Sequence, residues 1–216
     1  MEKTMRKHIG LIVIAGMMAA APAHAGGYAA LSLASNSLEI DSEGSTFEFE
    51  SEGISLQLAG RYVLEQGVMF QFDYNSHDFD EVCLGSDCLD VDATIDETQV
   101  RVGYMWQVDD ASRPEWHVFL GHMSLDFEVE GESDDEDGIA LGGGVRFFGG
   151  SGWSFPLELA LYNLDDSDGA SIELGVDYDV SEQFRLGVSI RGLSLEDEVD
   201  DEYSSGRFRA TAALLF

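Results

Sequence analysis

Two histidines in the sequence lie beside groups with which an imidazole can do chemistry. His77 precedes Asp78 and lies close to Asp80, and a histidine paired with an aspartate can serve as a general base. His122 and Ser124 share one face of an extended strand. A polar residue at a strand end explains the first group, and a β-bulge at that point of the chain explains the second. We therefore predict no catalytic residue.

A larger set of polar residues combines arginines with carboxylates on alternating positions. A guanidinium can bridge several carboxylates, so the set predicts either a structural network or a path for ions or small solutes. A solvent-exposed face would be expected to carry some lysine, and no lysine follows Lys7. We expect the following residues to line an interior: Arg61, Asp73, Arg101, Arg146, Glu158, Glu173, Asp177, Arg185, Arg191, Arg207 and Arg209.

The N-terminus has the three parts of a secretory signal peptide. Basic residues up to Lys7 precede an apolar run, and small residues end the segment at Ala25. The run is shorter than the roughly 20 residues that a membrane-spanning helix needs, although a retained anchor is the alternative. We expect residues 1–25 to be the signal peptide and residues 26–216 to form one domain.

The two cysteines of the chain lie close together in CLGSDC, at Cys83 and Cys88. Export places them in an oxidising compartment, where a disulfide persists. The alternative is a metal-binding pair, but no second group of Cys or His lies near them in the sequence. We predict a disulfide that fixes a local turn, and we predict no metal site and no cofactor.

The expected mature chain is strongly acidic. Residues 26–216 hold eight arginines and 41 acidic residues, a formal charge of −33. Such a field repels nucleic acid and attracts divalent cations or cationic partners. Adaptation to a salty habitat is an equally good explanation.

Alternation with a period of two residues recurs along the mature chain and predicts β-strands with two unlike faces. We expect ten strands, near residues 27–38, 53–64, 67–79, 94–106, 115–128, 138–148, 152–163, 170–180, 184–195 and 205–216. Longer acidic links alternate with short ones, as in an all-β, antiparallel up-and-down barrel whose termini share one end. Eight strands remain the alternative.

One face of these segments is apolar and carries aromatic residues near the short links. Examples are Trp106, Trp116, Trp153 and Tyr178. Transmembrane barrels place such an aromatic girdle at the membrane interface, whereas a soluble core has no reason to sort aromatic residues by height. We therefore expect the apolar face to lie in lipid and the arginine-rich face to line the lumen.

With its signal peptide, alternating segments, acidic links and terminal FRATAALLF, the chain resembles Gram-negative bacterial outer-membrane β-barrel proteins. In that class the last strand commonly ends in Phe after alternating apolar residues, and the assembly machinery recognises it. The resemblance implies that Phe208, Leu214 and Phe216 form the assembly signal. It also implies an outer-membrane location with both termini in the periplasm, and as partners the membrane lipid, lipopolysaccharide and the barrel-assembly machinery.

Several functions fit such a barrel. We expect a non-catalytic barrel, either a narrow pore or a structural or surface-display protein. The alternative is an outer-membrane protease or lipid-modifying enzyme that uses His77 or His122 near the extracellular rim. The acidic links also predict loose screening by divalent cations rather than one tight site, since the spacing of a calcium-binding loop is incomplete in LDDSDG.

Deletion of Phe216 is expected to impair membrane assembly in cells more than it lowers the stability of a barrel that has already assembled. The reason is that the assembly machinery would recognise the terminal aromatic ring. Quantifying folded barrel in membranes, and separately the unfolding of refolded protein, checks this. Equal assembly of the truncated and full-length chains would contradict it.

Overall fold

The computed structural model describes residues 26–42, 45–50, 54–84, 87–106, 114–129, 131–197 and 201–216. The predicted signal peptide, residues 1–25, lies outside the described residues. Among the described residues, no helix has the length and apolar character that crossing a membrane requires. The strands are β1 (Gly26–Ser42), β2 (Ser45–Glu50), β3 (Ser55–Val63), β4 (Val68–Leu84), β5 (Asp87–Trp106), β6 (Glu115–Val129), β7 (Glu132–Gly150), β8 (Trp153–Leu164), β9 (Ser167–Ser181), β10 (Phe184–Asp197) and β11 (Glu202–Leu215).

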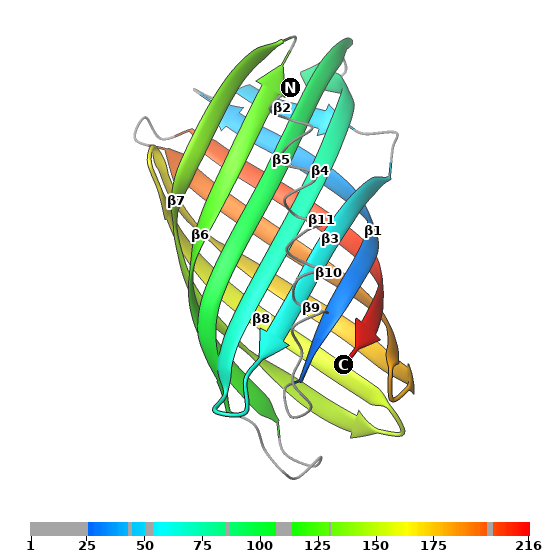
Figure 1. Ribbon diagram of the computed structural model, residues 1–216. Helices are drawn as coiled ribbons and strands as arrows, with labels where there is room; N and C mark the ends of the chain where they lie inside the picture. Colours follow the sequence, from blue (N-terminus) through cyan, green and yellow to red (C-terminus); the bar gives the residue numbers. More distant parts are fainter. Residues whose placement is uncertain are drawn as a thin grey trace.

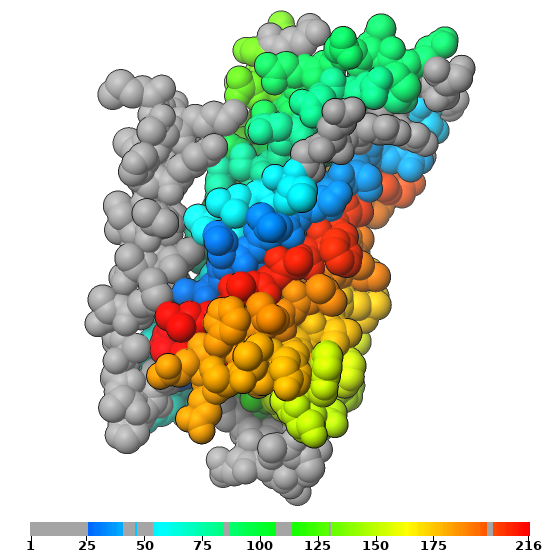
Figure 2. All heavy atoms as spheres, turned by 90° about the vertical axis from the view of Figure 1, so that its right-hand side faces the viewer, coloured from blue at the N-terminus to red at the C-terminus, as the bar shows by residue number. Residues whose placement is uncertain are grey.

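These strands form one closed antiparallel barrel (Figure 1). Each strand from β4 to β11 pairs with the next, and β11 pairs with β1 over the length of both strands. The blue β1 accordingly lies beside the red β11 in Figure 2. Strands β2 and β3 both lie between β1 and β4 and share one position in the wall. The described residues therefore confirm the predicted ten-strand, up-and-down barrel, and the alternative of eight strands is wrong.

Four strands extend well beyond the others at the end opposite the C-terminus (Figure 1). The predicted links 80–93 and 129–137 are wrong, because β4 continues to Leu84, β5 begins at Asp87 and β7 begins at Glu132. One face of these extensions is buried, because its side chains, such as Phe79 and Leu125, are apolar. This burial stabilises the extensions as paired strands. We call this extension, residues 76–84, 87–98, 122–129 and 131–138, the wall.

The outer face of the barrel below the wall is apolar. Leu120, Leu161 and Ile190 are each more than half exposed in the isolated chain. An apolar surface that continues around a barrel is not stable in water and is expected in lipid. At the end with the short turns, Trp106 lies directly opposite Trp116. The rings of Trp153 and Tyr178 lie 4.8 Å apart at the same end.

A β-bulge was one explanation of the changed alternation near His122 and Ser124, but strand β6 is regular there. Its pairing with β5 runs without a register shift from Val129 to Trp116, and its pairing with β7 is also continuous. The interpretation as a β-bulge is therefore wrong. The pattern changes because the inward positions Phe119 and Met123 are apolar, while the outward positions from His122 onward are polar.

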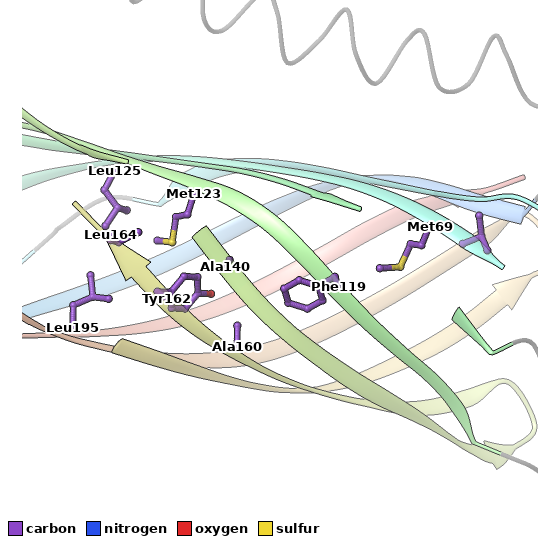
Figure 3. Packing of buried hydrophobic residues seen from close by; sticks show 10 residues of the cluster. Met69, Phe119, Met123, Leu125, Ala140, Ala160, Tyr162, Leu164 and Leu195 are labelled. Atoms are coloured by element: carbon purple, nitrogen blue, oxygen red, sulfur yellow. The ribbon is translucent and has the colours of Figure 1, made fainter. Parts of the chain in front are cut away.

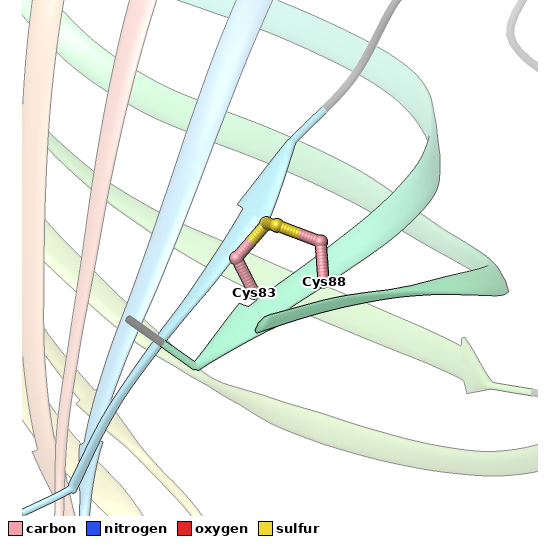
Figure 4. Close-up of a disulfide and its surroundings, with 2 residues drawn as sticks. All are labelled: Cys83 and Cys88. Carbon is pink, nitrogen blue, oxygen red and sulfur yellow. A yellow bond between two sulfur atoms is a disulfide. The ribbon is translucent and has the colours of Figure 1, made fainter. Parts of the chain in front are cut away.

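The predicted disulfide between Cys83 and Cys88 is present at the tip of the β4–β5 hairpin (Figure 4). The two residues lie directly opposite each other in the strand pairing. Among the described residues, one group of side chains is close enough to share a metal ion, and it consists of these cysteines and Glu81. Because the disulfide occupies both sulfur atoms, the alternative of a metal-binding cysteine pair is wrong.

Replacing both cysteines with serine is expected to destabilise this hairpin by about 2 kcal/mol, the loop entropy that a crosslink of this short span removes. The barrel below should keep its stability, because the bond closes only a local turn. Limited proteolysis should then cut the double variant at the hairpin tip and leave a folded barrel core. Unchanged protease resistance of the hairpin, or loss of the whole barrel, would contradict this expectation.

Candidate functional site

The interior of the barrel brings together all eleven residues that the sequence predicted for it. They line one internal space that also contains Glu97 and Glu115. The lining holds seven arginines and six carboxylates, and Asp179 adds a seventh carboxylate through its 2.5 Å ion pair with Arg185. The lumen is therefore close to neutral, and the large negative charge of the chain lies elsewhere.

Glu97 on β5 joins opposite sides of the lumen. Its Oε1 accepts a hydrogen bond from Arg191 at 2.5 Å, and its Oε2 accepts one from Arg207 at 2.5 Å. Strands β5 and β10 stand five positions apart in the ten-position barrel, so the Glu97–Arg191 pair crosses the full width. Glu97 is buried, and Arg191 also donates to the hydroxyl of Tyr162 at 2.9 Å.

A second group forms around Glu158 on β8. Arg101 donates to its Oε1 at 2.6 Å, His117 Nε2 lies 3.0 Å from its Oε2, and Arg61 lies 3.8 Å from the same oxygen. Gln99 connects the two groups, because its amide nitrogen donates to Glu97 and its oxygen accepts from Arg101 Nε at 2.8 Å. The result is one continuous hydrogen-bonded network across the lumen.

The remaining predicted residues form pairs around this network. Asp177 forms an ion pair with Arg146 at 3.2 Å and lies 4.0 Å from Arg185. Arg209 pairs with Glu173, and Asp73 accepts a hydrogen bond from Gln71 at 2.8 Å. We call these pairs and the two groups around Glu97 and Glu158 the ion-pair network.

Buried apolar side chains also pack together in the lumen (Figure 3). This apolar layer lies beside the ion-pair network, since Leu125 pairs with Glu97 and Met123 with Gln99 on the neighbouring strand, and it extends into the wall. Along β8, Glu158 is followed at inward positions by Ala160, Tyr162 and Leu164, and along β6, His117 is followed by Phe119, Met123 and Leu125. Met123 is fully buried. The lumen is therefore not lined by the predicted polar side chains alone, because on these two strands the inward face changes from polar to apolar toward the wall.

The space left between the side chains of the ion-pair network is about 130 Å³. A single water needs roughly 10–15 Å³ by the same measure, so this space has room for about ten waters among the ion pairs.

Among the described residues, no hydrogen bond joins His77 to Asp78 or His122 to Ser124. His77 points inward and is buried against Phe79, with 4.6 Å between ring centroids, whereas Asp78 points outward and accepts a hydrogen bond from Thr94. Neither ring nitrogen of His77 has a hydrogen-bond partner among the described residues. Strand alternation separates the two side chains, so they do not form a His–Asp pair.

His122 is exposed on the outer face of the wall. Its Nδ1 lies 2.8 Å from the carbonyl oxygen of Gly138, and its Nε2 lies 3.6 Å from Asp137. Asp137 is a neighbour that the sequence did not predict. Ser124 shares this outward face, directly opposite Asp137 in the pairing of β6 with β7.

Acidic residues also lie around Tyr203, near the wall end of the barrel. Burial raises the pKa of Tyr203, and the nearby carboxylates of Asp197 and Asp201 raise it further. On the outer face of the wall, Asp96 lies directly opposite Asp126, which in turn lies opposite Asp135.

Glu97 and His117 are central to the ion-pair network, yet the predicted set contains neither of them. Glu97 shares a face with Arg101, so period-two alternation alone could have placed it in the lumen. His117 likewise has the parity of Phe119. No sequence signal shows that Glu97 meets arginines from β10 and β11.

The residues of the predicted assembly signal lie on the closing strand and just after it. Phe208 and Leu214 point outward, each about half exposed. Phe216 pairs with Gly27 through two backbone hydrogen bonds, which close the barrel at its end with the short turns. Their role in assembly stays a prediction.

Residues 9–169 match the family model described as outer membrane protein beta-barrel domain. No curated protein matches the chain. Similar solved structures include Neisserial surface protein A (13% identity, 89% of this chain and 97% of that one, TM-score 0.45), the toluene transporter TodX of P. putida (8%, 90% and 90%, 0.44) and the attachment invasion locus protein Ail of Yersinia pestis (14%, 88% and 99%, 0.42). With TM-scores below 0.5, these likenesses carry no functional argument.

Proposed function

Because the chain belongs to the family of outer membrane protein β-barrel domains, we propose that it is a closed, non-catalytic anchor that displays an acidic wall outside the cell. The observation that carries this proposal is the bridge from Glu97 to Arg191 and Arg207 across the lumen. Larger barrels that conduct have an aqueous channel, whereas here ion pairs and an apolar layer fill the interior.

The closed lumen has two independent physical supports. Buried ion pairs resist rearrangement, because removing one partner leaves an uncompensated charge in a poorly hydrated space. The apolar layer beside them contains Phe119, Met123 and Leu125, and apolar side chains in a narrow lumen oppose wetting. A hydrated ion would have to displace both kinds of side chain to cross.

The proposed orientation in the membrane rests on a difference between the two ends of the barrel. The turns at Glu65, Ser151 and Glu182 are short and lie at the end where Gly27 pairs with Phe216, while the wall lies at the other end. Outer-membrane barrels have short turns in the periplasm and longer segments outside the cell. This supports a periplasmic location of both termini and exposure of the wall on the cell surface.

Cysteine labelling tests the display of the wall. Ser133→Cys places a thiol on the wall, and the matched control Glu182→Cys places one in the β9–β10 turn; both positions are exposed. A bulky maleimide that does not cross the outer membrane should label Ser133→Cys in intact cells, and Glu182→Cys only after permeabilisation. The reverse pattern would overturn the proposed orientation.

The proposal of no catalysis is supported by the separation of His77 from Asp78 by strand alternation. His122 stands on the outer face beside Asp137. Purified barrel should therefore neither cleave peptides nor deacylate lipid A. Activity that His77→Ala or His122→Ala abolishes would overturn this part of the proposal.

Divalent cations are proposed partners of the wall. Asp96, Asp126 and Asp135 stand opposite one another in three neighbouring strands, and like charges at such positions are destabilising. Cations held loosely among them relieve this repulsion.

Calcium is therefore expected to raise the melting temperature of the barrel by more than sodium does at equal ionic strength. The difference should shrink in Asp126→Asn, because the central charge of the row is removed. Thermal unfolding in detergent measures both. A calcium effect of equal size in the variant would contradict the assignment to this row, and a stoichiometric tight isotherm in calorimetry would contradict loose screening.

A further inference from the structure

The outer face of the barrel has a hollow of about 640 Å³ where β1, β8, β9, β10 and β11 run side by side. Strands β1, β10 and β11 of this region face the viewer in Figure 2. We call it the outer hollow and define it by six of its lining residues: Ser37, Ile172, Gly192, Ser194, Ser204 and Gly206. It lies outside the lumen and belongs to no part of the ion-pair network.

Two glycines create the outer hollow. Gly192 lies directly opposite Gly206, and this pair is flanked by Ile172 on β9 and Ser37 on β1. A Cβ atom built on Gly192 would meet only the Cγ2 of Ile172, at 3.9 Å, so the space above the backbone is open.

The outer hollow lies at the boundary between two kinds of surface. One row toward the short turns, Ile190 lies opposite Phe208, and both are more than half exposed. One row toward the wall, Ser194 lies opposite Ser204, and the next row pairs Glu196 with Glu202. Ser194 donates a hydrogen bond to Glu202 at 3.0 Å. The outer hollow is thus apolar on the side of the short turns and lined by hydroxyl groups on the side of the wall. Carboxylates border it beyond the hydroxyl groups.

We propose that the outer hollow holds one acyl chain of a lipopolysaccharide molecule, with the polar linkage of that chain against Ser194 and Ser204. The proposal rests on the proposed orientation, which puts this end of the apolar band in the leaflet that contains lipopolysaccharide. Divalent cations join the phosphates of the lipid to Glu196 and Glu202, since Ca²⁺ and Mg²⁺ are ligated by carboxylate and phosphate oxygens.

Lipid is the occupant that the surroundings favour. The outer hollow continues the apolar band that lipid already covers, and its floor is backbone whose polar groups are paired within the sheet. Small residues let another chain approach a backbone closely, as an acyl chain would here. A second copy of the protein would instead bring Glu39, Glu196 and Glu202 against their own counterparts, and like charges oppose that contact.

The test fills the outer hollow and measures lipid binding. Gly192→Leu places a side chain in the open space, whereas the control Val188→Leu adds apolar bulk on the same strand and face, outside the outer hollow. Purified barrel in detergent is incubated with lipopolysaccharide and Mg²⁺, and retained lipid is measured by native mass spectrometry. Phosphatidylethanolamine serves as the comparison lipid.

The expected result is one retained lipopolysaccharide per wild-type and Val188→Leu barrel, and binding about tenfold weaker for Gly192→Leu, a change of roughly 1.4 kcal/mol. A chelator of Mg²⁺ should weaken wild-type binding. Equal retention by Gly192→Leu, equal retention of phosphatidylethanolamine, or dimers in place of lipid would overturn the proposal. If Gly192→Leu does not fold, Ser194→Leu fills the adjacent space and is subject to the same criteria. Because binding in detergent does not depend on orientation in the cell, this result is separate from the cysteine labelling.

Discussion

Replacing Glu97 with glutamine is expected to lower the free energy of unfolding by about 3–5 kcal/mol. The carboxylate of Glu97 accepts hydrogen bonds from Arg191 and Arg207, and it is the only acidic group for which the described residues give an ion pair with either arginine. Glutamine keeps the shape of the side chain but removes the charge. Two buried guanidinium groups would then face each other without a counter-charge.

The size of the effect comes from the burial of all three groups. The side chain of Glu97 is 6% exposed, and those of Arg191 and Arg207 are each 10% exposed, so water compensates little for the lost charge. The matched control is Asp92→Asn on the same strand, where the carboxylate is exposed. Surface substitutions of that kind change stability by about 0.5 kcal/mol or less.

Urea unfolding of refolded barrel, followed by tryptophan fluorescence and by mobility on unheated gels, measures both variants. A loss below about 1 kcal/mol for Glu97→Gln would show that the bridge contributes no more than an exposed ion pair. Equal losses for Glu97→Gln and Asp92→Asn would also contradict the account, because burial would then make no difference.

Replacing Phe119 with alanine is expected to destabilise the barrel by about 3–5 kcal/mol, the range for a buried aromatic residue cut back to a methyl group. Phe119 is 2% exposed and belongs to the apolar layer. Its ring also lies 4.5 Å from the guanidinium carbon of Arg101. The substitution therefore leaves a cavity and removes a cation–π contact from the ion-pair network at the same time.

The neighbouring position provides the control. Leu120 points outward into the apolar band and is 58% exposed. Leu120→Met keeps an apolar group of similar volume in lipid, and we expect a change well below about 1.5 kcal/mol. The same urea titration compares the two variants. A loss for Phe119→Ala that does not exceed the loss for Leu120→Met would mean that the interior at this level is not packed.

Alternation along each strand was enough to predict that the arginines line the inside of the barrel. Arg61, Arg101 and Arg207 lie on different strands, yet all three have the parity opposite to that of the exposed apolar residues, and all three line the lumen. The odd or even position of a residue in its strand does not specify which residues of other strands it contacts. The pairing of Glu97 with Arg191 depends on strand number and stagger around the closed barrel, neither of which a single strand encodes.

The wall and the apolar layer were missed for a related reason. Outward residues such as Asp96 and Asp126 are polar, so the segments that carry them look like acidic loops, although their inward residues are apolar. In the membrane-spanning part the apolar side faces outward, and in the wall it faces inward. When the apolar side changes from outward to inward along one strand, the alternation in the sequence looks interrupted. This happened between Phe119 and Met123.

Conductance across a planar bilayer tests the closed lumen most directly. Wild-type barrel is first shown to be folded and inserted by its mobility on unheated gels and by protease access to the wall. The ion-pair network and the apolar layer together predict no conductance steps at any applied voltage, with no change when salt concentration is raised. Reproducible single-channel steps from inserted wild-type protein would contradict the account, because they require a continuous water path past Glu97 and Phe119.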